Sequence, residues 1–270
     1  MNIESNFIEF RNAKRIWAIG SVHSNYKSLE SIKQHIISNF KKNDKLVFLG
    51  NIIGLGNNAR DTLNSVLNLR LTLMGKFNLF PDDIVFLRGA QEEMFLKLMQ
   101  LQIAPNPNDI LSWMFDHGVN RTIESYGLSS EEIKTIANQG TISISKWTSK
   151  LNLEVSSIPG HKDYFSNLKH AAFTSSKKIL FVNRGVDISR PLSAQNDCFW
   201  WGYQNFSKLN QPYNSFIRIV RGYQSQIQNN LSNVKNTVVC TLFNQPLENS
   251  KVLGGLFGIN GEILDLFESS

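Results

Sequence analysis

The chain has 270 residues, 41% of them hydrophobic and 19% charged, so it can bury a sizeable core and is not intrinsically disordered. Its net charge is +6, but the Lys and Arg residues are scattered without a run of five or more. A nucleic-acid-binding protein usually carries a clustered basic stripe, so an ordinary solvated surface is the better interpretation.

Three early segments repeat one plan, in which a short apolar run ends in Gly and is followed by a helical pattern. The runs are residues 16–20, 46–50 and 84–89. The apolar residues after each run share one helical face: Leu29, Ile32, Ile36 and Ile37; Leu63, Val66, Leu67 and Leu71; Met94, Phe95, Leu98 and Met99. Ser24 or Asn25 is placed to cap the first helix. Alternating strands and helices predict a parallel sheet, with sites at the carboxyl ends of its strands.

The rest of the chain has two different patterns. Residues 106–150 indicate several helices, which we expect to form an insert packed over the sheet edge. Strand signals return at residues 170–174, 179–183, 216–221, 234–242, 252–258 and 262–267. Asn260-Gly261 between the last two predicts a tight hairpin. We expect a mixed or antiparallel sheet here, and one domain over residues 1–270 with the helical insert at about 106–150.

Composition also bears on the compartment. Residues 1–15 contain acidic residues and lack a continuous apolar core, so we expect no signal peptide. No stretch approaches 18 apolar residues, so we expect no membrane partner. Cys198 and Cys240 are far apart and are predicted to be free, buried thiols. Together these features predict a cytoplasmic protein.

Five short motifs follow the predicted strands in a definite order. They are Gly20-Ser21-Val22-His23-Ser24, Gly50-Asn51-Ile52-Ile53-Gly54-Leu55-Gly56, Gly89-Ala90-Gln91-Glu92, Phe181-Val182-Asn183-Arg184-Gly185 and Arg221-Gly222-Tyr223-Gln224. In this order they resemble the motifs of the calcineurin-like metallophosphoesterases, and are most similar to bacterial serine/threonine protein phosphatases of that superfamily. The resemblance covers residues 15 to 267 and implies an α/β fold, the four-layer α/β/β/α sandwich of that superfamily with a helical insert.

The resemblance also implies a site for two divalent metals, such as Mn or Fe, and assigns each ligand position to a residue of this chain. Those positions hold Ser21, His23, Asn51, Ala90, Asn183, Arg221 and Tyr223. Only His23 keeps the residue type of the family. The position of the family's catalytic proton donor holds Gln91, and the position of its phosphate-binding Arg holds Leu55.

These replacements remove the chemistry that the resemblance implies. Two divalent ions held about 4 Å apart need anionic ligands, above all a bridging carboxylate, whereas Asn51 and Ser21 are neutral. Arg221 places a fixed positive charge where an imidazole would donate a lone pair. Gln91 cannot donate a proton near neutral pH, and Leu55 cannot hold a phosphate oxygen. We therefore predict that the chain uses no cofactor and is not an enzyme.

The surviving polar residues allow two further interpretations. A candidate anion site consists of Arg221, Arg184 and Asn183. Arg at this position could bind a phosphate without hydrolysing it, although Arg221 could instead pair with an acid or point to solvent. His23 could hold a single metal with Asn51 and Asn183, but a hydrogen-bonded remnant is the preferred interpretation.

The remaining titratable residues are interpreted as structural. Glu92 could be a catalytic carboxylate, but an acid in the first turn of a helix already has a structural use there. His117, His161 and His170 have no ligand spacing and are expected at the surface or at an interface.

The sequence therefore favours a catalytically inactive pseudophosphatase that acts as a binding or scaffolding protein. Its expected partner is another protein, with phosphate or a phosphopeptide as a candidate ligand. The alternative is a divergent metal-dependent serine/threonine phosphatase or phosphoesterase. A third hypothesis, nucleic-acid binding through the basic charge, is disfavoured and would require a steep salt dependence of affinity.

Overall fold

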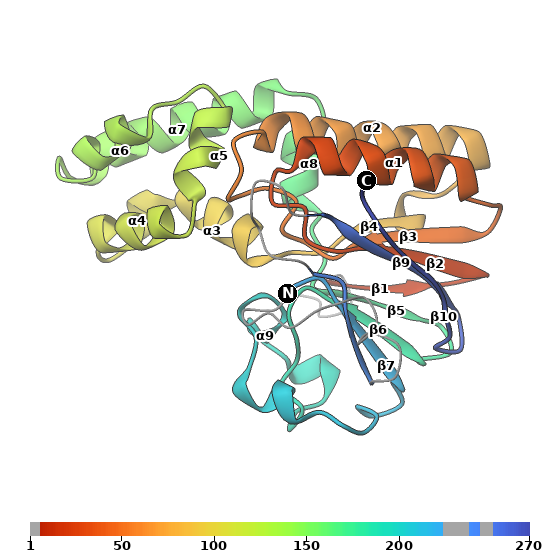
Figure 1. The fold of residues 1–270 in the computed structure, drawn as a ribbon. Helices are drawn as coiled ribbons and strands as arrows, with labels where there is room; N and C mark the ends of the chain where they lie inside the picture. The colour runs from red at the N-terminus through yellow and green to blue at the C-terminus, as the bar shows by residue number, and fades with distance from the viewer. Residues whose placement is uncertain (1–5, 224–237, 244–250) are drawn as a thin grey trace.

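A computed structural model describes residues 6–223, 238–243 and 251–270. In this part of the chain two five-stranded sheets are stacked on each other, and helices cover the outer face of the first sheet (Figure 1). The first sheet has the strand order β10-β9-β2-β3-β4, and the second has the order β1-β5-β6-β7-β8. The predicted α/β sandwich is therefore confirmed.

The first sheet contains the predicted strand–helix repeat. Its strands are β2 (Arg15–Ile19), β3 (Asp44–Phe48), β4 (Ile84–Phe86), β9 (Leu253–Gly258) and β10 (Ile263–Glu268). Strands β2, β3 and β4 are parallel, as predicted. Each leads into a helix: α1 (Tyr26–Asn39), α2 (Ala59–Phe77) and α3 (Ala90–Leu98). Asn25 caps α1, because its side chain accepts a hydrogen bond from the backbone N–H of Ser28.

The second sheet is mixed, as predicted, but its membership differs from the expectation. Its strands are β1 (Phe7–Phe10), β5 (Ala171–Thr174), β6 (Ile179–Val182), β7 (Arg218–Arg221) and β8 (Val239–Thr241). Strand β1 was not predicted, and it pairs in parallel with β5. The hairpin of β9 and β10 joins the first sheet instead, where β9 runs antiparallel to β2. Residues 234–237 of the strand predicted at 234–242 lie outside the described residues.

Consecutive helices follow α3, and all but the last lie to one side of the sandwich, at the left of Figure 1. They are α4 (Pro107–Asp116), α5 (Val119–Ser125), α6 (Ser130–Ile136), α7 (Thr141–Ser157) and α8 (His161–Ser166). The helical segment therefore extends beyond residue 150, to Ser166. The division into one domain with an insert stays a prediction.

Alternating side chains of the strands supply separate cores. Trp17 of β2 and Phe48 of β3 pack against α1 and α2, while Ile16 and Val47 face the second sheet. The outer face of the second sheet packs against α9 (Cys198–Trp201), η4 (Leu192–Ala194) and η5 (Gln204–Lys208), which form the fourth layer. Because β2, β3, β4 and β6 bury both faces, their runs are mostly apolar.

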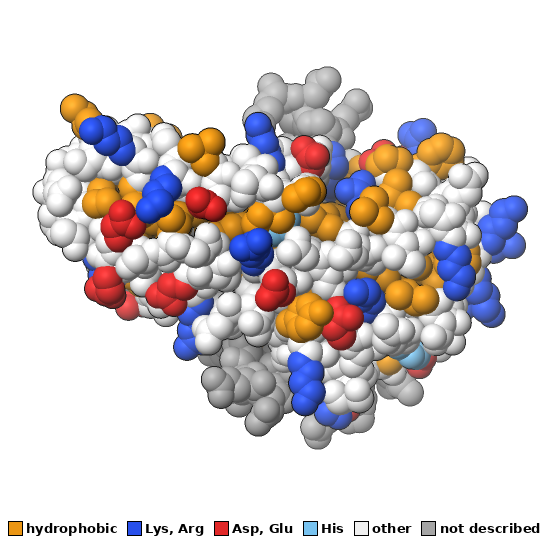
Figure 2. Space-filling model, turned by 90° about the horizontal axis from the view of Figure 1, so that it is seen from above, with side chains coloured by type: hydrophobic (Ala, Val, Ile, Leu, Met, Phe, Trp, Pro, Cys, Tyr) orange, Lys and Arg blue, Asp and Glu red, His pale blue; other side chains and the backbone are white. Residues whose placement is uncertain are grey.

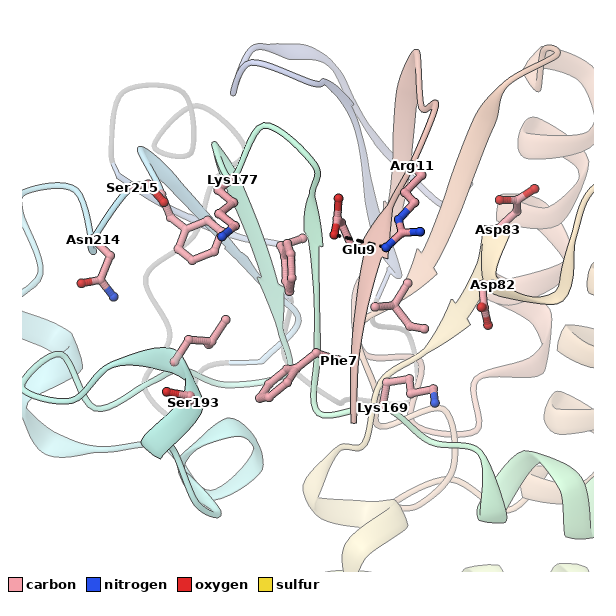
Figure 3. Close-up of a pocket in the computed structure, with 14 residues that line it drawn as sticks. Phe7, Glu9, Arg11, Asp82, Asp83, Lys169, Lys177, Ser193, Asn214 and Ser215 are labelled. Carbon is pink, nitrogen blue, oxygen red and sulfur yellow. Dashed lines mark ion pairs between the residues drawn. The ribbon is translucent and has the colours of Figure 1, made fainter. Parts of the chain in front are cut away.

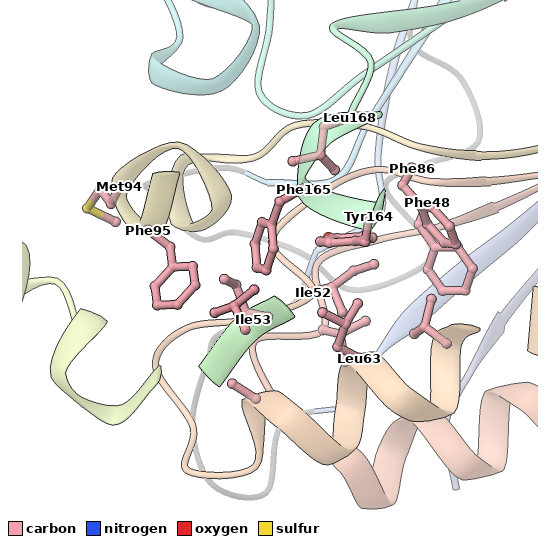
Figure 4. Packing of buried hydrophobic residues seen from close by; sticks show 14 of the residues in the cluster. Phe48, Ile52, Ile53, Leu63, Phe86, Met94, Phe95, Tyr164, Phe165 and Leu168 are labelled. Carbon is pink, nitrogen blue, oxygen red and sulfur yellow. The ribbon is translucent and has the colours of Figure 1, made fainter. Parts of the chain in front are cut away.

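Helix α8 connects the helical segment to the core between the first sheet and its covering helices (Figure 4). The Tyr164 ring lies 5.3 Å from that of Phe86, and the Phe165 ring lies 5.2 Å from that of Phe95 in α3. The prediction that Leu71 lies on the buried face of α2 is wrong, because this side chain is 67% exposed.

On the helical face of the molecule, side chains of both charges are interspersed (Figure 2). This agrees with the scattered charge of the sequence. No helix among the described residues has the length and apolar character needed to cross a membrane.

Candidate functional site

The loops after β2, β3 and β4 meet at the carboxyl ends of these strands. The backbone carbonyl of Asn51 accepts hydrogen bonds from the N–H groups of Val22 (3.0 Å) and His23 (2.8 Å). Several residues here adopt positive φ angles, which non-Gly residues rarely do: His23 (50°), Ser24 (61°), Asn51 (55°) and Leu55 (59°). Such conformations persist only where the surrounding contacts impose them, and they concentrate at functional sites.

Glu92 holds the loop after β3 in place. Its fully buried carboxylate accepts hydrogen bonds from the backbone N–H groups of Asn51 (2.8 Å), Ile52 (2.8 Å) and Gly89 (3.0 Å), and from the Tyr164 hydroxyl (3.2 Å). Burial raises the pKa of Glu92, while the backbone hydrogen bonds oppose that rise. The Glu92 carboxylate is thus engaged in hydrogen bonds that hold the loop, which supports the structural interpretation made from sequence.

Asn51 and Ser21 bond directly to each other. The Asn51 amide nitrogen donates to the Ser21 hydroxyl over 3.2 Å, and the Asn51 amide oxygen accepts the backbone N–H of Gln91 over 3.0 Å. Both residues are buried. Two carboxylates at these positions would repel each other unless a cation lay between them, whereas an amide and a hydroxyl satisfy each other.

The helical segment contacts Gln91 and Leu55. The Gln91 side-chain amide donates to the backbone carbonyl of His117 over 3.0 Å. A guanidinium nitrogen of Arg121 donates to the backbone carbonyl of Leu55. Gly118 lies so close to Leu55 that an added methyl group would come within 2.9 Å of its side chain. The turn between α4 and α5 therefore packs on the site.

His23 is buried in an aromatic environment. Its ring lies 5.8 Å from that of Tyr223 and 6.0 Å from that of Phe243, and burial lowers its pKa to about 3, so the ring is neutral at physiological pH. Neither ring nitrogen has a hydrogen-bond partner among the described residues. The prediction of a hydrogen-bonded remnant is therefore wrong for the His23 side chain within this part of the chain.

Asn183 connects the two sheets at the site. The side-chain amide nitrogen of Asn183 donates to the backbone carbonyl of Leu49 over 2.6 Å. The backbone carbonyl of Asn183 accepts the N–H groups of Gly222 and Tyr223, each over 2.9 Å. The amide oxygen of Asn183 is buried and has no partner among the described residues. Asn183 therefore presents an acceptor, not a donor, at this place.

Two guanidinium groups lie beside this turn. The Arg184 guanidinium lies 5.4 Å from the centre of the Tyr223 ring. Arg221 donates to the Thr241 hydroxyl over 2.8 Å and lies 5.2 Å from the centre of the Phe206 ring. Burial and the nearby positive charge of Arg184 lower the pKa of Arg221 to about 10. Arg184 therefore lies near Arg221, and the anion site of Arg221, Arg184 and Asn183 stays a prediction.

Ala90 and His161 complete the comparison with sequence. Ala90 begins α3 and offers only a methyl group at its ligand position. His161 was expected at the surface or at an interface, but it is fully buried within the chain. Its ring bonds the Tyr126 hydroxyl over 2.7 Å and the Asn64 amide oxygen over 2.9 Å, so it joins the helical segment to α2. Sequence reasoning had no signal for this contact, since its partners lie far apart along the chain.

No protein-family model matches the sequence, and no curated protein is similar to it. Solved structures are similar in fold. A provisionally assigned diadenosine tetraphosphatase aligns with a TM-score of 0.51 and 13% identity over 98% of both chains. A serine/threonine phosphatase from Saccharomyces cerevisiae, with similarity to human phosphatase PP5, aligns with a TM-score of 0.52 and 13% identity over 98% of this chain and 83% of its own.

These two structures show that the chain has the fold of the calcineurin-like metallophosphoesterases. At 13% identity the likeness establishes the fold alone, and residue roles have to be argued from the chain itself.

The prediction that the chain uses no cofactor is wrong in the light of these neighbours, whose fold is that of metal-dependent phosphoesterases. It rested on residue types alone, although hydroxyl, amide and neutral imidazole groups can each coordinate a metal. The described donors nevertheless do not fit a pair of divalent ions. Among the described residues no group of three or more His, Cys, Asp or Glu side chains could hold an ion, and both amide atoms of Asn51 are engaged in hydrogen bonds.

Proposed function

We propose that this chain is a catalytically inactive phosphatase relative that works as a binding or scaffolding module, in the cytoplasm. The observation that carries the proposal is the direct hydrogen bond between Asn51 and Ser21. The resemblance assigns these positions to metal-binding carboxylates, and here they satisfy each other without a charge between them. Cys198 and Cys240 are free and buried, which fits a reducing compartment.

Two further contacts support inactivity. The side chain at the proton-donor position, Gln91, is engaged with the His117 carbonyl and has no proton to give near neutral pH. Leu55, at the position of the phosphate-binding Arg, is packed against Gly118. These defects concern proton transfer and substrate binding, so they are independent of the metal question.

We further propose that the ligand of this site carries a phosphate group, as a phosphorylated segment of a partner protein. Arg184 forms no ion pair with the described residues, and its charge lies close enough to Arg221 to lower the pKa of that group. A doubly charged phosphate would relieve this repulsion and accept charge-assisted hydrogen bonds. Asn183 would contribute by holding the Gly222–Tyr223 turn that supports Arg184.

The second candidate is a divergent metal-dependent phosphoesterase. It is favoured by the unpartnered ring nitrogens of His23 and the unpartnered amide oxygen of Asn183, which are buried donors of the kind that metals use. The mutual bonding of Asn51 and Ser21 favours the inactive module over this candidate.

Turnover of p-nitrophenyl phosphate with manganese distinguishes the two, together with elemental analysis of the purified protein. We expect no hydrolysis above background in the wild type and the same result in His23→Ala. Hydrolysis by the wild type that is lost in His23→Ala would establish the second candidate and remove the first.

Calorimetric titration of a phosphoserine peptide tests the ligand. We expect binding by the wild type and at least a tenfold loss in Arg184→Ala and in Arg221→Ala. Lys146→Ala is the matched control, because this exposed lysine lies in α7. Negligible binding by all proteins, or equal binding of the unphosphorylated peptide, would remove the phosphate ligand but leave the question of catalysis untouched.

A further inference from the structure

A second cleft lies at the opposite end of the parallel strands. It is formed by residues 11–12 before β2, residues 42–45 before β3, and residues 76–83 before β4, and its volume is about 540 Å³. The loops at the candidate site follow the carboxyl ends of these strands, so the cleft is separated from that site by the length of the sheet. None of the motifs that carry the resemblance contributes to it.

The lining of this cleft is strongly basic. Among its described residues four cations face a single carboxylate, that of Asp83: Arg11, Lys42, Lys45 and Lys76. Lys45 forms an ion pair with Asp83, so one of the four is neutralised. Arg11 has only a long contact with Glu9 (3.9 Å), and both side chains are exposed. Lys42 has no ion pair with a described residue. The cleft therefore retains an excess of positive charge.

Aromatic side chains lie beside these cations. Phe77 and Phe80 line the same cleft, and Phe80 is 75% exposed, which is unusual for so large an apolar group. The Lys76 ammonium lies 5.3 Å from the centre of the Phe77 ring. A ligand in the cleft would thus meet both positive charge and apolar surface.

The cleft continues into a larger cavity of about 1040 Å³, because Arg11 and Asp83 line both. Figure 3 shows Arg11, the residue that follows β1, opposite Asp82 and Asp83, with Lys177 and Ser215 on the other side of the strand. The larger cavity also contains an apolar group of side chains, namely Phe7, Phe173, Leu192 and Phe216. Charged side chains of both signs also line the larger cavity, namely Glu9, Asp82 and Asp83 with Arg11, Lys169 and Lys177. The two cavities share lining residues and are treated as one groove, in which cations outnumber carboxylates.

Strand β1 runs along this groove and is the edge of its sheet. It pairs with β5 on one side, and no described strand pairs with its other side. An edge strand presents backbone N–H and C=O groups that can pair with an added strand. The groove therefore offers main-chain hydrogen bonds next to apolar pockets and positive charge.

We propose that this groove binds an extended acidic segment of a partner protein that also carries a bulky apolar residue. The segment pairs with the edge of β1, its apolar side chain enters the cavity beside Phe173 and Phe216, and its carboxylates meet Lys42 and Lys76. Charge complementarity selects the acidic sequence, and backbone pairing supplies affinity that does not depend on sequence. This site is independent of the phosphate site proposed above.

Fluorescence anisotropy with two synthetic peptides tests the proposal. The probe contains one Phe, one Val and four Glu residues, and the comparison peptide has Gln in place of each Glu. We expect the wild type to bind the Glu peptide at least tenfold more tightly than the Gln peptide. The double variant Lys42→Glu, Lys76→Glu should lose at least tenfold in affinity for the Glu peptide, and Phe80→Ser about threefold.

Lys146→Glu, Lys162→Glu is the matched control, because it reverses two exposed charges on α7 and α8. We expect it to bind the Glu peptide as the wild type does. Circular dichroism establishes that each variant is folded. Equal affinity for the two peptides, no binding of either, or equal losses in the two charge-reversal variants would overturn the proposal. So would a single-stranded oligonucleotide that binds this groove while the Glu peptide does not.

Discussion

The polar groups at the two ends of strands β2, β3 and β4 differ in their internal contacts. At the carboxyl ends, Asn51, Ser21 and Gln91 bond to each other or to backbone groups, and Glu92 is surrounded by N–H donors. At the amino ends, Lys42 and Arg11 line an open cleft with few described partners. At the carboxyl ends the side chains of Asn51 and Glu92 are therefore satisfied by internal contacts, whereas the ring nitrogens of His23 and the amide oxygens of Gln91 and Asn183 are not.

The difference has a consequence for where the molecule can bind. A buried group that already has its hydrogen bonds gains little from a ligand, whereas an excess of exposed like charge is relieved by one. At the candidate site His23, Ser24, Gln91 and Asn183 each keep a buried polar atom that has no partner among the described residues. The basic groove is therefore a second place to look for a partner.

The largest expected effect belongs to Glu92. Glu92→Gln leaves one oxygen to accept several buried N–H groups, so we expect the free energy of unfolding to fall by about 3 kcal/mol or more. Urea denaturation measures this free energy of unfolding. Glu131→Gln is the control, because Glu131 also lies in a first helical turn but is exposed, and it should cost about 0.5 kcal/mol. Equal costs would mean that Glu92 does not hold the site.

The next effect concerns a close backbone approach. An added methyl group at Gly89 would lie 2.3 Å from the Asn51 amide oxygen and 2.4 Å from its backbone nitrogen. Gly89→Ala should therefore destabilise the protein by about 2 kcal/mol. Gly75→Ala in α2, where no atom lies within 4 Å, should instead stabilise it by about 0.5 kcal/mol. Thermal denaturation that shifted both variants in the same direction would contradict this reading of the site.

Acid provides a third test, through His161. Burial lowers the pKa of folded His161 from 6.5 to about 4, so the unfolded chain takes up a proton first as the pH falls. The contribution of neutral His161 to the free energy of unfolding is fully present above pH 6.5. It is lost between pH 6.5 and 4, by up to about 1.4 kcal/mol per pH unit. Urea denaturation at pH 6.5 and 5.5 should show a smaller loss in His161→Asn than in the wild type. Parallel losses would show that His161 does not carry this dependence.

The smallest effect is expected at the amino ends. Lys42→Gln removes a charge that forms no ion pair with a described residue, so the free energy of unfolding should change by less than about 0.5 kcal/mol. A loss above 1 kcal/mol in urea denaturation would mean that Lys42 is structural, and it would weaken the contrast between the two ends.

Much of the fold could be predicted from sequence because local patterns of apolar residues determine it. The apolar runs of β2, β3 and β4 and the helical faces after them predicted that these strands are parallel. They also predicted that a site would lie at the carboxyl ends of these strands. The pairing of β1 with β5, and of β9 with β2, was not predicted. Strand partners that are distant in sequence leave no local signal, since any short apolar strand can fit several sheet edges.

The amino-acid sequence alone determined which chemical groups stand at the loop ends: Asn, Ser, Gln and Leu in place of carboxylates, imidazole and guanidinium. It therefore set their charge. Only the tertiary structure decided how those groups are satisfied, as in the bond between Asn51 and Ser21 and the closure of the α4–α5 turn on Gln91. Residue type fixes whether a group donates, accepts or carries charge, but a hydrogen bond also requires two distant segments to be brought within about 3 Å of each other.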